Sequence, residues 1–194
     1  MKTFIFKTVL LLVMIISVLG CSSDDVVCPE LTCLNGGIFK DCSCNCPQGY
    51  SGTNCEIQIT PSKIKVTNIR VKAFPNYNNL EGWDIGSGPD IFVRLGVGNG
   101  DENTVVLYSS GYMPDAISNG FNYYDFRPNQ PIEINNSLSK HIIALFDYDS
   151  TSFNEVIGAF TFNIYEPNNH FSDKLILRDT SIPLEFELSL TYQW

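Results

Sequence analysis

Residues 184–194, at the end of the chain, read Leu-Glu-Phe-Glu-Leu-Ser-Leu-Thr-Tyr-Gln-Trp. Large apolar side chains occupy every second position, and polar side chains occupy the positions between them. Successive side chains of a β-strand point to opposite faces, so this alternation predicts a half-buried strand. Its apolar face would consist of Leu184, Phe186, Leu188, Leu190, Tyr192 and Trp194.

Similar patterns recur in residues 62–194. Residues 91–97 place Ile91, Val93, Leu95 and Val97 on one face. Further strands are predicted at residues 69–74, 104–110, 132–134, 141–146 and 156–164. Turn residues such as Gly98-Asn99-Gly100-Asp101 separate them, and no helical stretch intervenes. The segment therefore predicts an antiparallel β-sandwich, and the whole chain is expected to be all-β.

The first 20 residues have the organisation of an export signal. Two lysines precede an apolar run over residues 9–19, which is too short to span a bilayer as a helix. The run ends in Leu19-Gly20-Cys21, which resembles a bacterial lipobox. The resemblance implies a lipoprotein signal peptide at 1–20, lipidation at Cys21 and a lipidated linker at 21–27. An ordinary signal peptide followed by an unrelated cysteine is the alternative.

The linker also bears on location. Ser22-Ser23-Asp24-Asp25 resembles the acidic tags that direct some lipoproteins to the outer cell surface, although an ordinary polar linker has the same composition. We therefore expect a lipid-anchored protein of the bacterial outer membrane or cell surface.

The other six cysteines lie between residues 28 and 55, and none follows Cys55. An even, dense cluster in a short exported segment predicts disulfides, because so few residues cannot bury a sufficient core. A thiolate metal site is disfavoured by the oxidising compartment and by the lack of histidine in the segment. Spacing alone does not choose among the many pairings that six cysteines permit.

Residues 33–37, Cys-Leu-Asn-Gly-Gly, and 44–56, Cys-Asn-Cys-Pro-Gln-Gly-Tyr-Ser-Gly-Thr-Asn-Cys-Glu, resemble an EGF-like domain. We assign residues 28–56 to it. The resemblance implies the disulfides Cys28–Cys42, Cys33–Cys44 and Cys46–Cys55. Val26-Val27 replaces the acidic residues that precede calcium-binding members, so we expect this domain to serve as a metal-free spacer.

Two segments at strand ends collect carboxylates. Residues 83–93 read Trp-Asp-Ile-Gly-Ser-Gly-Pro-Asp-Ile-Phe-Val, and residues 145–158 read Leu-Phe-Asp-Tyr-Asp-Ser-Thr-Ser-Phe-Asn-Glu-Val-Ile-Gly. If the two loops meet, five carboxylates converge, namely Asp84, Asp90, Asp147, Asp149 and Glu155. Such a cluster repels itself unless it is protonated or bridged by cations. Oxygen ligands without His or Cys favour Ca²⁺ over zinc or copper, and Mg²⁺ fits less well. Solvated acidic turns are the simpler alternative.

The segment from Lys63 to Trp194 resembles a C2 domain. In that family two Asp residues six positions apart precede a Tyr/Phe-Val strand, as Asp84 and Asp90 precede Phe92-Val93. A second loop has the form Asp-x-Asp with an acid eight residues after the first Asp, then Ile-Gly; the matching residues are Asp147, Asp149, Glu155, Ile157 and Gly158. The resemblance implies that the five acidic residues bind Ca²⁺. Glu155 stands where Asp is usual, and Gly88-Pro89-Asp90-Ile91 departs from the usual Ser-Asp-Pro order.

Other residues give weaker indications. The aromatic stretch 121–126 could form a carbohydrate platform, but core and cross-strand packing explain it more simply. His141 and His170 are distant in sequence, and no nucleophile–base pair is recognisable, so we expect no enzyme activity. The chain has 12 Lys+Arg against 21 Asp+Glu, a balance that argues against nucleic-acid binding.

The sequence thus predicts a calcium-dependent binding module held on a spacer and anchored in its own membrane through Cys21. In the C2 family, bound calcium bridges carboxylates to anionic head groups, and apolar loop residues insert beside it. Ile85 and Phe153 are the candidates for insertion here. The ligand would be an anionic lipid, a polysaccharide or a protein. A calcium-stabilised structural or interaction component of a surface assembly is the alternative.

Overall fold

The computed structural model describes residues 28, 30–78, 81–151, 153–167 and 169–194. The predicted signal peptide, Cys21 and the lipidated linker lie outside these residues. The described residues contain strands and turns but no α-helix, which confirms the all-β prediction. Accordingly, none of the described segments is a helix long and apolar enough to cross a membrane.

The cysteine-rich segment forms two small hairpins that are held by disulfides. Its strands are β1 (Ile38–Lys40), β2 (Ser43–Asn45), β3 (Tyr50–Ser51) and β4 (Ile57–Gln58). β1 pairs with β2, and β3 pairs with β4. The disulfides are Cys28–Cys42, Cys33–Cys44 and Cys46–Cys55, which confirms the predicted pairing. We refer to residues 28–58 as the N-terminal module.

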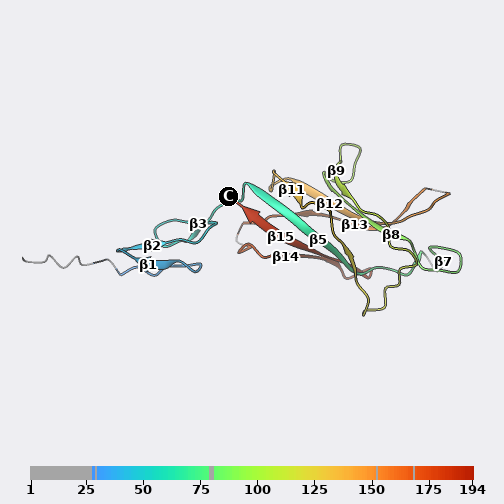
Figure 1. The fold of residues 1–194 in the computed structure, drawn as a ribbon, viewed down its shortest axis with the longest axis horizontal. Coiled ribbons are helices and arrows are strands. Elements are labelled where there is room, and N and C mark those ends of the chain that lie inside the picture. The colour runs from blue at the N-terminus through green and yellow to red at the C-terminus, as the bar shows by residue number, and fades with distance from the viewer. Residues whose placement is uncertain (1–27, 29, 79–80, 152, 168) are drawn as a thin grey trace, which may run out of the picture.

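Residues 63–193 form two antiparallel sheets that pack face to face (Figure 1). The first sheet has the order β10 (Tyr124–Phe126), β5 (Lys63–Ala73), β15 (Leu184–Gln193), β14 (Lys174–Asp179), and β11 (Ile132–Ile134) also pairs with β5. The second has the order β13 (Glu155–Asn163), β12 (Lys140–Asp147), β8 (Ile91–Val97), β9 (Val105–Ser109). A separate short hairpin consists of β6 (Tyr77–Asn78) and β7 (Glu81–Gly82). The predicted antiparallel sandwich is confirmed.

The core lies between the two sheets. β5 and β15 supply fully buried residues such as Val66 and Leu188, while β8 and β12 supply Leu95 and Leu145 from the opposite sheet. The alternation that predicts each strand therefore also selects the side chains of the core, since only one face of each sheet meets the other sheet.

The polar face of β15 is more buried than its alternation indicates. Glu185 and Glu187 are only 8% and 9% exposed. Lys72 pairs with Glu185 at 3.0 Å, and Lys174 pairs with Glu187 at 3.0 Å. The long lysine side chains lie across the sheet and cover the carboxylates, so burial here reflects ion pairing and not membership of the apolar core.

The aromatic stretch 121–126 divides between two environments. Phe126 belongs to β10, which pairs with β5, and is 3% exposed. Phe121 is 89% exposed and lies before the strand. Packing therefore explains the part of the aromatic stretch that lies in β10, whereas Phe121 remains exposed on the surface.

Candidate metal centre

The two acidic loops meet because their strands are neighbours in one sheet. In the strand register, Asp147 at the end of β12 lies opposite Ile91 at the start of β8 and opposite Glu155 at the start of β13. Carboxylate oxygens of Asp147, Asp149 and Glu155 lie within 4.8 Å of one another. The three acidic residues predicted in the second loop are thus brought together by register.

The first loop is attached to the second through Asp90. The Asp90 N–H donates a hydrogen bond of 2.7 Å to Asp147 Oδ1, and the Tyr148 N–H donates one of 2.8 Å to the Asp90 carbonyl. Burial raises the pKa of Asp84, and the charges of Asp90 and Asp149 raise it further. Asp84 therefore lies within electrostatic range of Asp90 and Asp149, whereas Asp147, Asp149 and Glu155 are the described residues whose carboxylate oxygens lie close enough to share an ion. We call the five predicted carboxylates the acidic cluster.

Asp147 lies at the centre of this cluster. Its side chain is fully buried, and Oδ2 has no hydrogen-bond partner among the described residues. Burial raises the pKa of Asp147 to about 6; the hydrogen bond from Asp90 opposes that rise, and the charges of Asp84, Asp149 and Asp90 add to it. A buried carboxylate oxygen without a partner is unfavourable, because it has lost water and gained nothing in exchange.

None of the ion pairs between described residues involves the five carboxylates. The repulsion between them is therefore not relieved by a neighbouring Lys or Arg. A hard divalent cation fits this donor set, because it would bond to Asp147 Oδ2 and attract the surrounding carboxylates. The residues present are thus suited to calcium, which prefers several oxygen ligands on flexible loops.

A sixth acidic residue, Asp115, joins the cluster and was not predicted. Met113 and Ile91 exchange backbone hydrogen bonds of 2.8 and 2.9 Å, which lay residues 113–116 beside the first acidic loop. The Asp115 N–H donates to Asp90 Oδ1 at 3.0 Å, and the charge of Asp115 contributes to the raised pKa of Asp84. Asp115 is a single acid in a turn segment without a recognisable spacing, so the sequence carried no signal for its role.

A glycine permits this close approach. A Cβ added to Gly88 would lie 2.2 Å from the Ala116 carbonyl oxygen, a distance that no side chain tolerates. The Ala116 N–H in turn donates a hydrogen bond of 2.8 Å to the Pro89 carbonyl. The unusual Gly88-Pro89 order of the loop therefore serves its contact with residues 113–116.

The two predicted insertion residues lie on the surface of the same loops. Ile85 is 107% exposed and Phe153 is 95% exposed, so neither contributes to the core. The base of the first loop is held by Trp83, whose Nε1 donates to the Pro75 carbonyl at 2.8 Å. In the second loop, Asn154 Oδ1 accepts a hydrogen bond of 3.1 Å from the Asp149 N–H. Each exposed apolar side chain therefore extends from a loop whose base is fixed.

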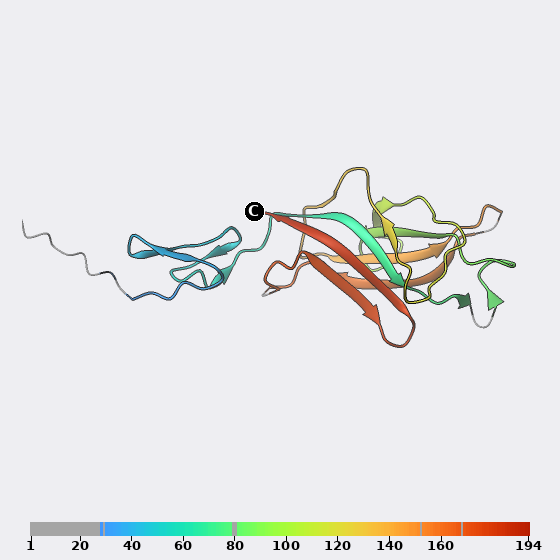
Figure 2. The same cartoon turned by 60° about the horizontal axis from the view of Figure 1, so that its bottom comes forward.

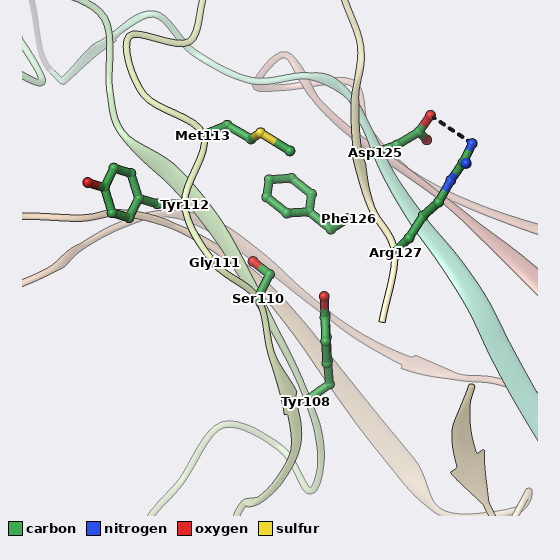
Figure 3. A pocket seen from close by; sticks show the side chains of 8 residues that line it. All are labelled: Tyr108, Ser110, Gly111, Tyr112, Met113, Asp125, Phe126 and Arg127. Atoms are coloured by element: carbon green, nitrogen blue, oxygen red, sulfur yellow. Dashed lines mark ion pairs between the residues drawn. The ribbon is translucent and has the colours of Figure 1, made fainter. Parts of the chain in front are cut away.

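A cavity of about 460 Å³ lies away from the acidic cluster, between residues 108–113 and β10 (Figure 3). Its charged lining residues, Asp125 and Arg127, form an ion pair of 3.8 Å. Arg70 also binds Asp125, with nitrogen–oxygen distances of 2.8 and 3.0 Å. Because Asp125 is already neutralised and no residue of the acidic cluster lines this cavity, we do not include it in the candidate site.

Comparisons with known proteins concern the sandwich. No family model and no curated protein matches the chain. Among solved structures, the chain is similar to a C2 domain at 13% identity, over 66% of this chain and 97% of that one, with a TM-score of 0.44. It is also similar to a C2 domain of plant extended synaptotagmin 1 at 17% identity, over 69% of this chain and 96% of that one, with a TM-score of 0.41.

A third similarity is to human GIVD cytosolic phospholipase A2, at 14% identity with a TM-score of 0.43. It covers 67% of this chain but 17% of the enzyme. All three similarities concern the sandwich part of the chain. The two packed sheets and the carboxylate cluster are seen directly in this chain and do not depend on these similarities.

Proposed function

We propose that this chain is a lipid-anchored protein of the bacterial cell envelope that binds an anionic surface ligand through calcium held by its acidic loops. The proposal is carried by the buried Asp147 Oδ2, which has no hydrogen-bond partner among the described residues, in a carboxylate whose oxygens lie close to those of Asp149 and Glu155. We propose binding and not catalysis as the role of this site, with Ile85 and Phe153 beside it as contacts to the ligand.

The inner part of the site would consist of Asp147, Asp149 and Glu155, whose carboxylate oxygens are already close together. Asp84 and Asp90 would complete it from the first loop. When bound, calcium would supply positive charge that both neutralises these residues and attracts phosphate, sulfate or carboxylate groups of a ligand. One or two ions fit the five predicted ligands.

The apolar side chains at the loop surface would add affinity for a lipid surface. Full burial of an Ile or Phe side chain is worth roughly 1.5–3 kcal/mol, which corresponds to about a tenfold or greater change in affinity per residue. Ile85 and Phe153 are nearly as exposed as side chains can be, so most of this energy remains available for an intermolecular contact.

Sedimentation with vesicles tests the proposal. The unanchored chain should sediment with phosphatidylserine vesicles in millimolar calcium and remain in the supernatant in EDTA. Replacing both Ile85 and Phe153 by serine should weaken binding by about tenfold or more without changing the calcium-induced rise in melting temperature. Leu138→Ser is the matched control, because Leu138 is an exposed apolar residue outside the acidic loops.

The experiment also separates the ligand classes. Binding to an acidic polysaccharide such as polygalacturonate, with no binding to vesicles, would identify a glycan as the anionic ligand. Calcium stabilisation without binding to either would favour the structural role, in which the ion only holds the loops together.

The anchor is tested independently of the calcium site. We propose that Cys21 is the first residue of the mature protein and carries the lipid that holds the chain in the outer membrane or at the cell surface. Intact-mass analysis of the protein from its native envelope should show a diacylated or triacylated Cys21. A mature N-terminus at another residue, without lipid, would contradict this part of the proposal.

A further inference from the structure

One of the contacts between the N-terminal module and the sandwich is made by Gln58, whose side-chain amide bonds through both its nitrogen and its oxygen. Gln58 Nε2 donates hydrogen bonds of 3.0 Å to the Tyr165 hydroxyl and 3.2 Å to Asn169 Oδ1. Gln58 Oε1 accepts a hydrogen bond of 3.3 Å from the His170 N–H. Gln58 belongs to β4 of the module, whereas its three partners belong to the sandwich, so these bonds fix one part relative to the other.

An aromatic cluster surrounds the same contact. The centroid of the Phe171 ring lies 5.3 Å from the ring centroid of Tyr50 in β3, 4.8 Å from that of Trp194 and 5.4 Å from that of Tyr192. A Cβ added to Gly49 would lie 2.5 Å from the Trp194 ring and 2.6 Å from the Phe171 ring. The rings therefore pack directly on the backbone of the N-terminal module.

The connection between the two parts is short and bonded along its length. β4 ends at Gln58 and β5 begins at Lys63, so residues 59–62 form the whole connection. The Ile59 carbonyl accepts a hydrogen bond of 3.0 Å from Trp194 Nε1, and Ser62 Oγ donates one of 3.0 Å to the Gln193 carbonyl. Both ends of the connection are thus bound to the last residues of the chain. We call these contacts the joint.

The acidic loops lie at the end of the sandwich opposite the joint. Figures 1 and 2 show the N-terminal module at the left and β7 and the loop between β12 and β13 at the right. β5 runs from the joint toward the acidic end, and its 11 residues span roughly 36 Å at about 3.3 Å per residue. The N-terminal module adds to this separation.

We infer that the joint makes the two parts one rigid rod and directs the acidic site away from the end that carries Cys21, so that the ligand lies in trans, on a surface other than the protein's own membrane. The inference rests on the proposed function for the identity of the anchor and the ligand. Residues 21–27 reach at most about 25 Å when fully extended. That reach is shorter than the sandwich alone, so a straight rod tethered at Cys21 cannot be inverted to point its acidic end at its own membrane.

Small-angle X-ray scattering tests rigidity without any ligand. The chain from Cys21 onward should scatter as a single elongated particle, with and without calcium. Inserting about twenty Gly/Ser residues between Thr60 and Pro61, in a chain that also carries Gln58→Ala and Phe171→Ala so that the noncovalent contacts of the joint are lost, should replace this with a broad distribution of shapes. If the uninserted chain already requires a distribution of bent forms, the joint is not rigid and the inference is wrong.

A vesicle-capture experiment tests orientation. Cys21, the thiol outside the three disulfides, is coupled to a maleimide lipid, and the chain is anchored on vesicles with or without phosphatidylserine. Capture of labelled phosphatidylserine vesicles in calcium should be equal on both anchor vesicles, because the acidic end of the straight rod cannot point at its own membrane. The insertion at the joint should lose most of its capture when the anchor vesicles contain phosphatidylserine, because the freed sandwich then binds in cis.

The same Gly/Ser segment placed between Glu102 and Asn103, in an exposed loop, is the control and should behave like the uninserted chain. Reduced capture by the uninserted chain on phosphatidylserine anchor vesicles would show binding in cis and overturn the inference. Equal behaviour of the joint insertion and the control would show that the joint does not set the orientation. Failure of the unanchored chain to sediment with vesicles would instead count against the proposed function, and the scattering result would still decide rigidity.

Discussion

The backbone N–H of Asp90 donates a hydrogen bond of 2.7 Å to Oδ1 of Asp147, while Oδ2 of the same carboxylate is buried and has no hydrogen-bond partner in the described part of the chain. One oxygen of Asp147 therefore joins the two acidic loops, and the other remains unsatisfied in a carboxylate that lies close to Asp149 and Glu155. The different roles of the two Asp147 oxygens explain how the protein can hold the loops together when no ion is bound and still favour the binding of an ion.

Asp147→Asn should have opposite effects with and without calcium. In EDTA the variant should be more stable, on the order of 1 kcal/mol, because a charge that repels Asp84 and Asp149 has been removed. In calcium it should lose most of the stabilisation seen in the parent chain, which is about 2.7 kcal/mol at a hundred times the dissociation constant. Thermal melting in the two conditions measures both changes, at roughly 4 °C per kcal/mol.

Glu102→Gln is the control for this variant, since it removes an exposed carboxylate from the loop between β8 and β9. It should leave both melting temperatures nearly unchanged. Coincident melting curves of the parent chain in calcium and in EDTA would mean that the acidic cluster binds no calcium.

Asp115→Asn tests the acidic residue that only the structure revealed. Asn tolerates the positive backbone angle of this residue, for which φ is 50°, so the fold should be retained. Because one attractive charge is lost at the edge of the cluster, calcium affinity should fall roughly 3- to 10-fold, equivalent to about 0.7–1.4 kcal/mol. Isothermal titration gives the affinity directly, and an unchanged value would place Asp115 outside the site.

His141 should make the protein less stable in mild acid. Its ring is fully buried in β12 beside Phe162, and neither ring nitrogen has a hydrogen-bond partner of normal geometry among the residues that the structure describes. Burial lowers the pKa of His141 below 6.5, although the nearby Ser139 backbone partly opposes this effect. The unfolded chain therefore binds a proton more readily, so the stability contributed above pH 6.5 should be lost as the pH falls below it.

Melting temperatures at pH 7.5 and 5.5, in saturating calcium so that the acidic cluster stays bound, check this prediction. His141→Leu should show a smaller loss between the two pH values than the parent chain. The exposed His170, replaced by Asn, should behave like the parent. An equal loss in the parent chain and in His141→Leu would assign the acid sensitivity to other groups.

Removing one disulfide should unfold the N-terminal module without unfolding the sandwich. The double change Cys33→Ala with Cys44→Ala removes one of its three cross-links, at a cost of about 2–5 kcal/mol. The strands of this module have only two or three residues each, so its own secondary structure adds little to the cross-links. Limited proteolysis should cut between residues 28 and 58 and leave the sandwich intact. Cys21→Ala, the control, should keep the resistance of the parent chain.

The sequence by itself determined the features that depend on local periodicity or spacing. Alternation in residues 184–194 predicted β15, because the pleat of a strand has a period of two residues whatever surrounds it. The spacing of Asp147, Asp149 and Glu155 predicted a shared site, because these residues end one strand and begin the next. The cysteine pairing followed from a family resemblance carried by local turn motifs.

Only the tertiary structure decided which distant groups these elements meet. It brought Asp115 to Asp90 through backbone pairing of Met113 with Ile91, a contact between loops that no local pattern encodes. It also placed Trp194, which continues the apolar alternation of β15, against the N-terminal module and not in the core. Both outcomes have the same physical reason: periodicity fixes the face on which a side chain lies, whereas register and loop path fix the neighbour that covers it.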